Sequence, residues 1–238
     1  MAQPETESET EPGHPSVVVT EDGPYRVTGG VRLTRTAIVE TEYGEPVDWE
    51  EGPEFRSRAT YDLCRCGRSS TKPFCDSTHE REPFDGAETA DRDVTARRRV
   101  TYQGDGVAMT DDRVFCTHAG FCGDRFTTVW VMIRQTADPA IRARLMDMVS
   151  KCPSGRLAYQ VPPDERDVER AYEPPSIGVE PNGPLWVRGG VPVVSEDGTP
   201  YEVRNRVTLC RCGRSSNKPF CDGSHKRVGF EDPAVPRA

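Results

Sequence analysis

The chain has 238 residues, of which 34% are hydrophobic, and its mean hydropathy is −0.68. This composition offers little apolar material for one large core and favours small modules braced by metal. The formal net charge of −8 argues against sequence-independent nucleic-acid binding and against attraction to anionic lipid. No apolar run is long enough to span a bilayer, so we expect no membrane association.

Residues 1–16 are acidic and polar, and they lack the basic start and apolar middle of a secretion signal. We expect them to form a disordered tail in which His14 is functionally silent. Because no export route is recognised, a cytoplasmic location is the default expectation. Nine cysteines in a reducing compartment are more often metal ligands or redox groups than disulfide partners.

Two segments of the chain are almost identical. Residues 63–76 read LCRCGRSSTKPFCD, residues 209–222 read LCRCGRSSNKPFCD, and each copy reaches a histidine at the same offset. Both copies therefore have the spacing C-x-C-x8-C-x3-H, which predicts a four-ligand metal site that occurs twice. The candidate ligands are Cys64, Cys66, Cys75 and His79 in the first copy and Cys210, Cys212, Cys221 and His225 in the second.

The repeat also includes the residues upstream of the cysteines. GPYRVTGGV at 23–31 matches GPLWVRGGV at 183–191, and both patterns predict a strand bounded by turns. A further strand is predicted over 201–209. The glycine-to-cysteine spacing is 41 positions in the first copy and 27 in the second. We place the extra residues of the first copy in a loop insertion around Glu40–Glu54.

Residues 138–151, between the copies, have the clearest helical pattern. Asp138 can cap the helix and Pro139 suits its first position. The apolar residues that fall on one face at helical spacing are Ile141, Leu145, Met148 and Val149. After this helix, residues 161–182 are rich in proline and charge, which is typical of a linker.

The ligand spacing bears on the choice of metal. Zinc prefers a closed tetrahedron of Cys and His, which three cysteines and one histidine would satisfy. C-x-C is nevertheless less usual for zinc than C-x2-C, whereas a two-iron cluster takes one pair of ligands per iron. In the first copy, Cys64 and Cys66 would hold one iron, and Cys75 and His79 the other. Because Cys75 and His79 are four positions apart, we expect them on one helical face.

The second copy, from Cys210 to His225, reads C-x-C-x2-S-x3-P-x-C-D-G-S-H and resembles the CDGSH iron–sulfur domain of the mitoNEET type. The resemblance implies a redox-active [2Fe-2S] cluster on three Cys and one His in each copy. It also implies a fold in which two modules pair by exchanging strands, here within one chain. The first copy departs from the pattern, with Ser77 in place of Gly223 and Pro83 in place of Gly229. Its ligands are retained, so a cluster is expected there too.

One imidazole in place of one thiolate would alter the cluster. A neutral histidine removes a negative charge, which raises the reduction potential relative to ligation by four cysteines. The imidazole can also be protonated near neutral pH, in competition with iron. We therefore expect acid to loosen the cluster.

The remaining cysteines are Cys116, Cys122 and Cys152, and His118 lies among them in sequence. The Cys-Pro pair at Cys152 is like the one that closes bacterial ferredoxin motifs. This unit resembles a divergent single-cluster ferredoxin-type domain, which implies an additional [3Fe-4S] or [4Fe-4S] cluster. Either His118 is a fourth ligand, or a three-iron cluster forms, or one iron keeps an open position. In the alternative without a cluster, His118 packs against Trp130 and the cysteines are merely buried.

The predicted architecture is a set of small β-rich iron–sulfur modules. Two CDGSH β-cap units form an intramolecular pseudo-dimer, with a small α+β ferredoxin-like domain between them. The predicted boundaries are a tail at 1–16, a first CDGSH module at 17–92, a ferredoxin-like cluster domain at 93–162, a linker at 163–182 and a second CDGSH module at 183–238.

The sequence contains no catalytic constellation, so we do not predict an enzyme. The predicted function is one-electron transfer with redox partner proteins. A first alternative is delivery of a labile cluster to apo iron–sulfur acceptors, or redox sensing. A second is a zinc-binding interaction module with no redox role.

Overall fold

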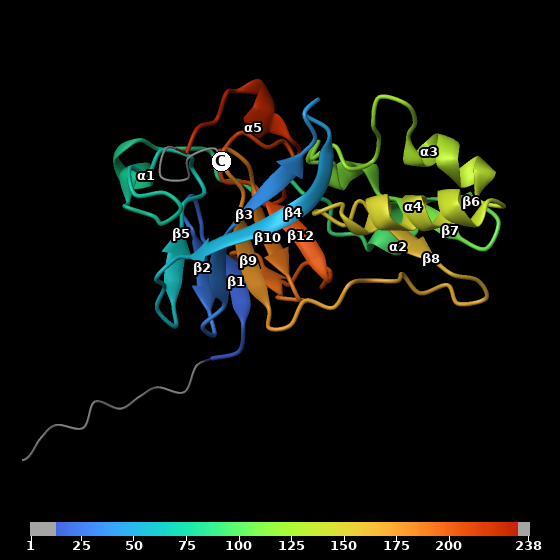
Figure 1. Cartoon of the computed structure of the whole chain (residues 1–238). Helices are drawn as coiled ribbons and strands as arrows, with labels where there is room; N and C mark the ends of the chain where they lie inside the picture. The colour runs from blue at the N-terminus through green and yellow to red at the C-terminus, as the bar shows by residue number, and fades with distance from the viewer. Residues whose placement is uncertain (1–12, 233–238) are drawn as a thin grey trace, which may run out of the picture.

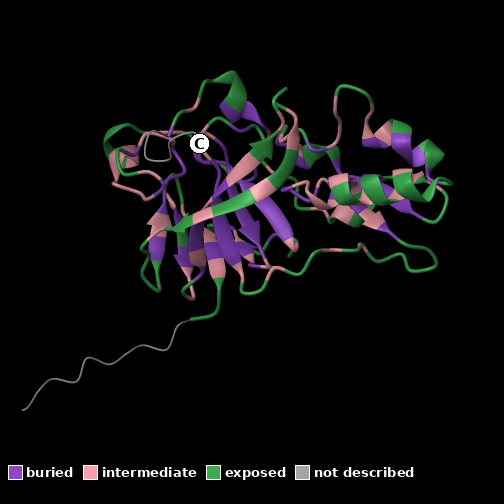
Figure 2. Ribbon diagram, in the orientation of Figure 1, coloured by how far each residue is buried: buried purple, intermediate pink, exposed green. Residues whose placement is uncertain are grey.

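The computed structural model of the chain describes residues 13–232. Two β-rich modules lie side by side, and a smaller domain that carries the longest helix lies beside them (Figure 1). Buried residues gather in the strands of the two β-rich modules, whereas the connecting loops are mostly exposed (Figure 2). The chain returns from the smaller domain through a long extended segment before it enters the second module.

The two modules build two sheets. One sheet has the order β11-β1-β2-β5, and the other has the order β12-β10-β9-β3-β4. The strands from the first module are β1 (Ser16–Val19), β2 (Tyr25–Thr28), β3 (Arg32–Glu40), β4 (Pro46–Glu54) and β5 (Tyr61–Leu63). The strands from the second module are β9 (Ser176–Val179), β10 (Leu185–Arg188), β11 (Val193–Val194) and β12 (Arg206–Leu209). Each sheet therefore contains strands of both modules.

The exchange of strands is reciprocal. Strand β1 pairs in parallel with β11, with Val17 opposite Val193, and β3 pairs in parallel with β9, with Leu33 opposite Ile177. The strands predicted over 23–31 and 183–191 are present as β2 and β10. The apolar side chains of both sheets join one core. Burial of this shared core is the main source of stability for both modules.

Tyr25 on β2 ties the first module to the ligand loop of the second. Its side chain is fully buried, and its hydroxyl donates to Cys210 O at 2.7 Å and to Pro219 O at 2.9 Å. Position 185 of the second module, which matches Tyr25 in the repeat, is a leucine without a hydroxyl. From this position of the repeat, the first module therefore donates a hydrogen bond to the second, but the second cannot donate one to the first.

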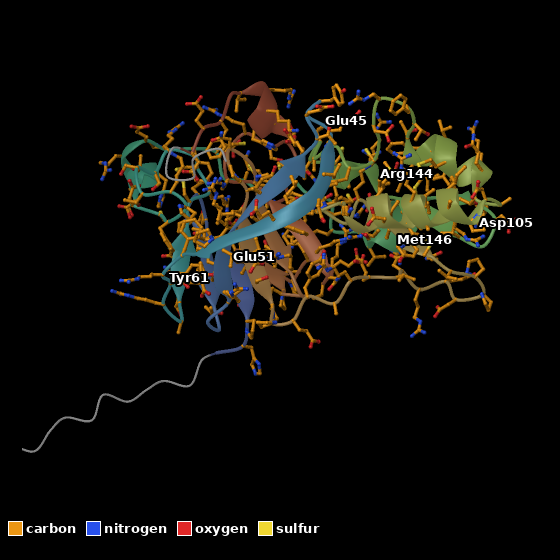
Figure 3. The ribbon with its side chains drawn as sticks, in the orientation of Figure 1. Glu45, Glu51, Tyr61, Asp105, Arg144 and Met146 are labelled. Carbon is orange, nitrogen blue, oxygen red and sulfur yellow. The ribbon has the colours of Figure 1, made fainter. Side chains whose placement is uncertain are left out.

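The insertion expected as a loop around Glu40–Glu54 is instead an antiparallel hairpin. Its strands are residues 34–40 of β3 and all of β4, and the turn between them closes through Gly44 at a φ of +75°. The expectation was wrong because the β-branched residues of β3 find an antiparallel partner in the acidic segment. Glu45, near the tip of the hairpin, lies beside the smaller domain, where it accepts from Arg125 (Figure 3).

The hairpin also packs against both other parts of the molecule. The Trp49 ring lies 5.1 Å from Phe121 of the smaller domain and 4.6 Å from Trp186 of the second module. Its indole nitrogen donates to Lys151 O at 2.9 Å. The extra residues of the first copy therefore position the smaller domain.

The smaller domain is an antiparallel sheet covered by helices. Its sheet has the order β6-β7-β8, from β6 (Val100–Gln103), β7 (Ala108–Asp111) and β8 (Leu157–Gln160). The helices are α3 (Val129–Met132), the 3₁₀ turn η2 (Ile133–Gln135) and α4 (Pro139–Ser150). The predicted helix is confirmed as α4, because Asp138 accepts from Ala140 N at 2.8 Å and Leu145 and Val149 are buried.

The other helical pieces are single turns. They are α1 (Thr78–Arg81) after the first cysteine motif, α2 (Thr95–Arg98) and the 3₁₀ turn η1 (Arg113–Phe115) at the entry to the smaller domain, and α5 (Ser224–Arg227) after the second cysteine motif. Of the strand predicted over 201–209, only Arg206–Leu209 is extended, and Tyr201 instead packs on Phe220 at 5.0 Å.

Two predicted boundaries need correction. Strand β9 lies within the expected linker 163–182, because Ser176–Val179 is buried between β10 and β3. Ser16, at the end of the expected tail 1–16, is the first residue of β1, and its hydroxyl contacts Thr28. Residues 1–12 lie outside the described part of the chain. Within residues 13–232, no helix is both long and apolar enough to cross a membrane.

Replacement of Tyr25 by Phe tests the link between the modules. We expect Tyr25→Phe to lower the free energy of unfolding by about 1–3 kcal/mol, because Cys210 O loses the hydroxyl donor and Pro219 O keeps only its bond from Cys210 N. Tyr61→Phe is the matched control, since the Tyr61 hydroxyl donates to Val31 O within the first module. Denaturant unfolding followed by circular dichroism and by visible absorbance measures both variants. Only Tyr25→Phe should perturb the second ligand loop, and an equal spectral change in both variants would contradict this assignment.

Candidate metal centres

The repeated cysteines and histidines come together as two pairs in each copy. In the first site, Cys64 Sγ lies 3.8 Å from Cys66 Sγ, and Cys75 Sγ lies 3.5 Å from His79 Nδ1. In the second site, the corresponding distances are 3.7 Å between Cys210 and Cys212 and 3.4 Å between Cys221 and His225. The same atoms are paired at nearly the same distances in both sites.

These distances fit metal coordination. Two donors on one tetrahedral ion lie about 3.8 Å apart for two sulfurs and about 3.5 Å apart for sulfur and nitrogen, given the usual bond lengths. Within residues 13–232, no three Cys, His, Asp or Glu side chains gather as around a single metal ion. Each site therefore offers two separate tetrahedral edges, and its donor set fits a group that contains two metals.

A hydrogen bond from the second cysteine, helped by backbone amides, favours the thiolate form of the first cysteine in each motif. A hydrogen bond from Cys66, together with the N–H groups of Ser69 and Gly67, lowers the pKa of Cys64 to about 6. The equivalent contacts lower the pKa of Cys210 to about 6. Thiolates are the form of cysteine that binds metals, so these amides prepare both loops for ligation.

The turn before each short helix brings the third cysteine to the histidine. Ser77 and Gly223 occupy the same left-handed conformation, with φ of 62° and 82°. Their N–H groups each donate to the preceding ligand sulfur at 3.4 Å. The expectation that Cys75 and His79 share a helical face was wrong, because the helix begins only at Thr78. A left-handed turn places the two donors together instead.

Sequence reasoning missed the carboxylate that holds each ligand loop closed. Asp76 accepts from Ser70 N at 2.8 Å and from Thr78 N at 3.0 Å, and hydrogen bonds lower its pKa below the usual range. Asp222 does the same with Ser216 N and Ser224 N at 2.9 Å each. The Asp directly after the third cysteine in both copies was the available signal.

Sequence reasoning also missed the arginine between the two cysteines of each C-x-C motif. Arg65 and Arg211 are both 2% exposed, which is unusual for arginine outside an ion pair. Arg211 donates to Gly183 O at 2.7 Å and pairs with buried Asp232, whereas Arg65 donates to backbone carbonyls. These side chains anchor the ligand loops and place positive charge behind them.

The two sites differ in burial although their ligands are the same. Cys75 and His79 are partly exposed, whereas Cys221 and His225 are only 2% and 4% exposed. Burial, with further contributions from the charges of Lys226 and Arg211, lowers the pKa of His225 to about 4. The buried ring of His225 is therefore harder to protonate than a solvent-exposed imidazole.

The C-x-C loops of the two sites touch each other. A Cβ atom at Gly67 would lie 2.8 Å from Cys212 O, and a Cβ atom at Gly213 would lie 2.7 Å from Cys66 O. Both glycines also have positive φ, at 81° and 72°. Only glycine allows the two backbones to approach so closely, so the two sites meet at this point.

The third set of cysteines lines a cavity in the smaller domain. Cys116, Cys122 and Cys152 contribute to its wall, together with His118 and Arg156. Burial, with the neighbouring charge of Cys152, raises the pKa of Cys122. All nine cysteines of the chain are free of disulfides.

His118 has a second role in the geometry of this region. It is exposed and has a left-handed φ of 59°, and the Arg156 guanidinium rather than His118 lies over Trp130, at 5.2 Å. The alternative in which His118 packs against Trp130 is therefore replaced. His118 instead lies beside the second site, where a Cβ atom at Gly223 would be only 2.4 Å from its Cδ2.

The fold and the donors define a β-rich protein with paired thiolate–imidazole metal sites. The family described as "Iron-binding zinc finger CDGSH type" matches residues 22–80 and 182–226, and "Divergent 4Fe-4S mono-cluster" matches residues 102–162. No curated protein matches the chain significantly. The chain thus carries two segments of the CDGSH type, which flank a segment of the divergent 4Fe-4S mono-cluster type. It is an iron–sulfur-binding protein.

The residue in the left-handed turn provides a matched pair of substitutions. We expect Gly223→Ser to lower stability by about 1–2 kcal/mol through left-handed strain, with an added cost from displacing His118. Ser77→Gly should change stability by less than about 1 kcal/mol, because relief of strain is offset by the greater freedom of glycine in the unfolded chain. Thermal unfolding of both variants measures the difference. Equal effects of the two substitutions would contradict the close contact at Gly223.

Proposed function

We propose that this chain is a one-electron transfer protein that holds a [2Fe-2S] cluster at each CDGSH site. The observation that carries the proposal is the pairing of donors two by two. Cys64 with Cys66, and Cys75 with His79, each span one tetrahedral edge, and the second copy repeats this pairing. When bound, such a cluster takes up and releases one electron in each redox cycle.

The protein residues around each site suit this task. Amide groups donate to the ligand sulfurs, and a buried arginine lies behind each C-x-C loop. Hydrogen bonds and nearby positive charge stabilise the more negative, reduced form of a cluster and so raise its potential.

The two CDGSH modules act, in this proposal, as an intramolecular pseudo-dimer. The reciprocal strand pairs and the glycine contacts at Gly67 and Gly213 support it. The two sites follow strands of two different sheets that share one core, and the C-x-C loops meet at Gly67 and Gly213. A short protein path between the sites favours transfer within the chain.

The smaller domain would add a third cluster, either [3Fe-4S] or [4Fe-4S], held by Cys116, Cys122 and Cys152. The three thiols share one cavity. The ring edge of His118 lies against Gly223, so we assign the ligand set to the three cysteines alone. An oxidised three-iron cluster has an electron paramagnetic resonance (EPR) signal, whereas an oxidised four-iron cluster is silent, and this difference identifies the type.

One observation favours a second candidate function, cluster delivery. The donors Cys75 and His79 are partly exposed, so an acceptor protein could reach that iron. Reversible reduction with full retention of iron would favour electron transfer. Appearance of the cluster in an apo-ferredoxin on mixing would favour delivery.

Counting metals tests the proposal directly. Anaerobic purification should yield a coloured protein with about seven or eight irons per chain, a similar amount of inorganic sulfide and no zinc. After reduction, EPR should show signals of reduced [2Fe-2S] clusters. A colourless protein that carries zinc and lacks sulfide would support the zinc-binding interaction module and refute electron transfer.

Replacement of a histidine ligand tests the donor set. We expect His225→Cys to lower the reduction potential of the second cluster by on the order of 100 mV, because a thiolate adds negative charge to the cluster. His79→Cys should do the same at the first site, whereas His118→Ala should change neither of these potentials so strongly. Redox titration followed by visible absorbance measures all three variants. An unchanged potential in His225→Cys would remove His225 from the ligands.

A further inference from the structure

The second CDGSH site is covered by the smaller domain of the same chain. The covering segment is residues 114–118, which directly precede and include part of the central cysteine loop. The Phe115 ring packs on Phe220 at 5.0 Å, edge to face. Phe220 directly precedes the ligand Cys221, so the segment lies on the loop that holds the metal donors.

Three further contacts hold the covering segment in place. Asn217 Nδ2 donates to Val114 O at 3.0 Å, and Lys226 Nζ donates to His118 O at 2.6 Å. The His118 ring lies so close to Gly223 that a side chain there would collide with it. The contacts come from both sides of Cys221 and extend past His225, which explains why these two donors are buried.

The two copies differ at these contact positions. Over residues 63–79 and 209–225 the copies differ three times, and two of the differences are Thr71 against Asn217 and Ser77 against Gly223. The next difference along the chain is Glu80 against Lys226. Glutamate has no proton to donate to a backbone carbonyl when it is ionised, and serine adds the Cβ atom that His118 excludes. The first copy therefore lacks the features that accept the covering segment.

A second segment, residues 88–92, covers the same loop from another direction. The N–H groups of Thr89 and Ala90 both donate to Lys218 O at 2.8 Å, and the Thr89 hydroxyl donates to Ser216 O. This segment connects the first module to the smaller domain. Within residues 13–232, no hydrogen bond of this kind joins the first ligand loop to the smaller domain, and Cys75 and His79 stay partly exposed.

The contacts also set the order of the three sites. The central loop carries Cys116 and, two residues later, His118 against the second site. The second site in turn meets the first through Gly213 and Gly67. The second CDGSH site therefore lies between the other two.

We propose that the chain arranges its three sites in series, with the second CDGSH site enclosed in the middle by residues 114–118 and the first CDGSH site as the open one. Outside molecules reach the paired clusters through the partly exposed donors Cys75 and His79. This inference rests on the proposed function, because it assumes that both CDGSH sites hold iron.

Iron release from single-site variants tests the inference. Cys75→Ser leaves the second site intact, and Cys221→Ser leaves the first. With the Fe²⁺ chelator ferrozine under reducing conditions, we expect release from the first site to be at least about tenfold faster, since an enclosed site must open before a chelator can enter. The unmodified protein should release these irons in two phases. Equal rates from the two sites would overturn the proposal.

Exchange of the contact residues between the two copies tests whether residues 114–118 cause the slower iron release from the second site. In the Cys75→Ser background, the combined variant Asn217→Thr, Gly223→Ser, Lys226→Glu should accelerate release from the second site towards the rate of the first. The matched control is Thr71→Asn, Ser77→Gly, Glu80→Lys in the Cys221→Ser background. It should leave the rate unchanged because, in the described part of the chain, no segment of the smaller domain is hydrogen-bonded to those residues. An unchanged rate in the first swap would overturn the role of residues 114–118.

Amide hydrogen exchange gives a readout that does not depend on iron release. In otherwise unmodified protein, the swap at Asn217, Gly223 and Lys226 should raise exchange in residues 114–118 and 223–228, and it should leave helix α4 unchanged. Unaltered exchange in both segments would overturn the proposal that residues 114–118 enclose the second site. A protein without iron and sulfide would instead refute the proposed function, so the two failures are distinguishable.

Discussion

Strands β1 and β3 leave the first module to pair with strands β11 and β9 of the second, and the two modules share one hydrophobic core. Each module alone has only a few short strands and too few apolar side chains for an independent core. The exchange of strands gives both modules one shared core. It also brings the C-x-C loops into contact, since Gly67 and Gly213 lie at the interface. The positions of both metal sites therefore depend on this pairing.

The chain is acidic overall, yet it gathers cysteines in three places. In each C-x-C motif, a hydrogen bond from the second cysteine, together with backbone amides, lowers the pKa of the first, Cys64 or Cys210. Arg65 and Arg211 are buried in the same loops. Local hydrogen bonds thus favour one thiolate in each CDGSH site although the chain as a whole carries a net negative charge.

Two nearly identical motifs have different surroundings because a third unit lies on only one of them. The hairpin β3–β4 positions that unit through Trp49, and residues 114–118 complete the contact at the second site. Identical ligands in unequal environments give a chain two sites with different access and different electrostatics. Duplication of the motif alone would have produced two equivalent sites.

Sequence patterns predicted the structure correctly where the residues that form a feature lie close together in the chain. The spacing of Cys and His predicted the ligand pairs, the cap at Asp138 and the apolar face predicted α4, and the flanking glycines predicted β2 and β10. Strand β9 was missed because its four residues, Ser176–Val179, are too short and too mixed to be distinguished from a linker. The β3–β4 hairpin was missed because an acidic segment becomes a strand only when a partner strand lies beside it.

The sequence by itself therefore determined which side chains form the candidate metal sites, because ligand spacing and turn chemistry are properties of a few consecutive positions. The tertiary structure alone decided which site is enclosed and which is open. That difference arises from contacts between Val114, Phe115 and His118 and residues about a hundred positions away, and no periodicity along the chain encodes such a contact. For the same reason, the role of Asn217, Gly223 and Lys226 could be assigned only from their contacts in the tertiary structure.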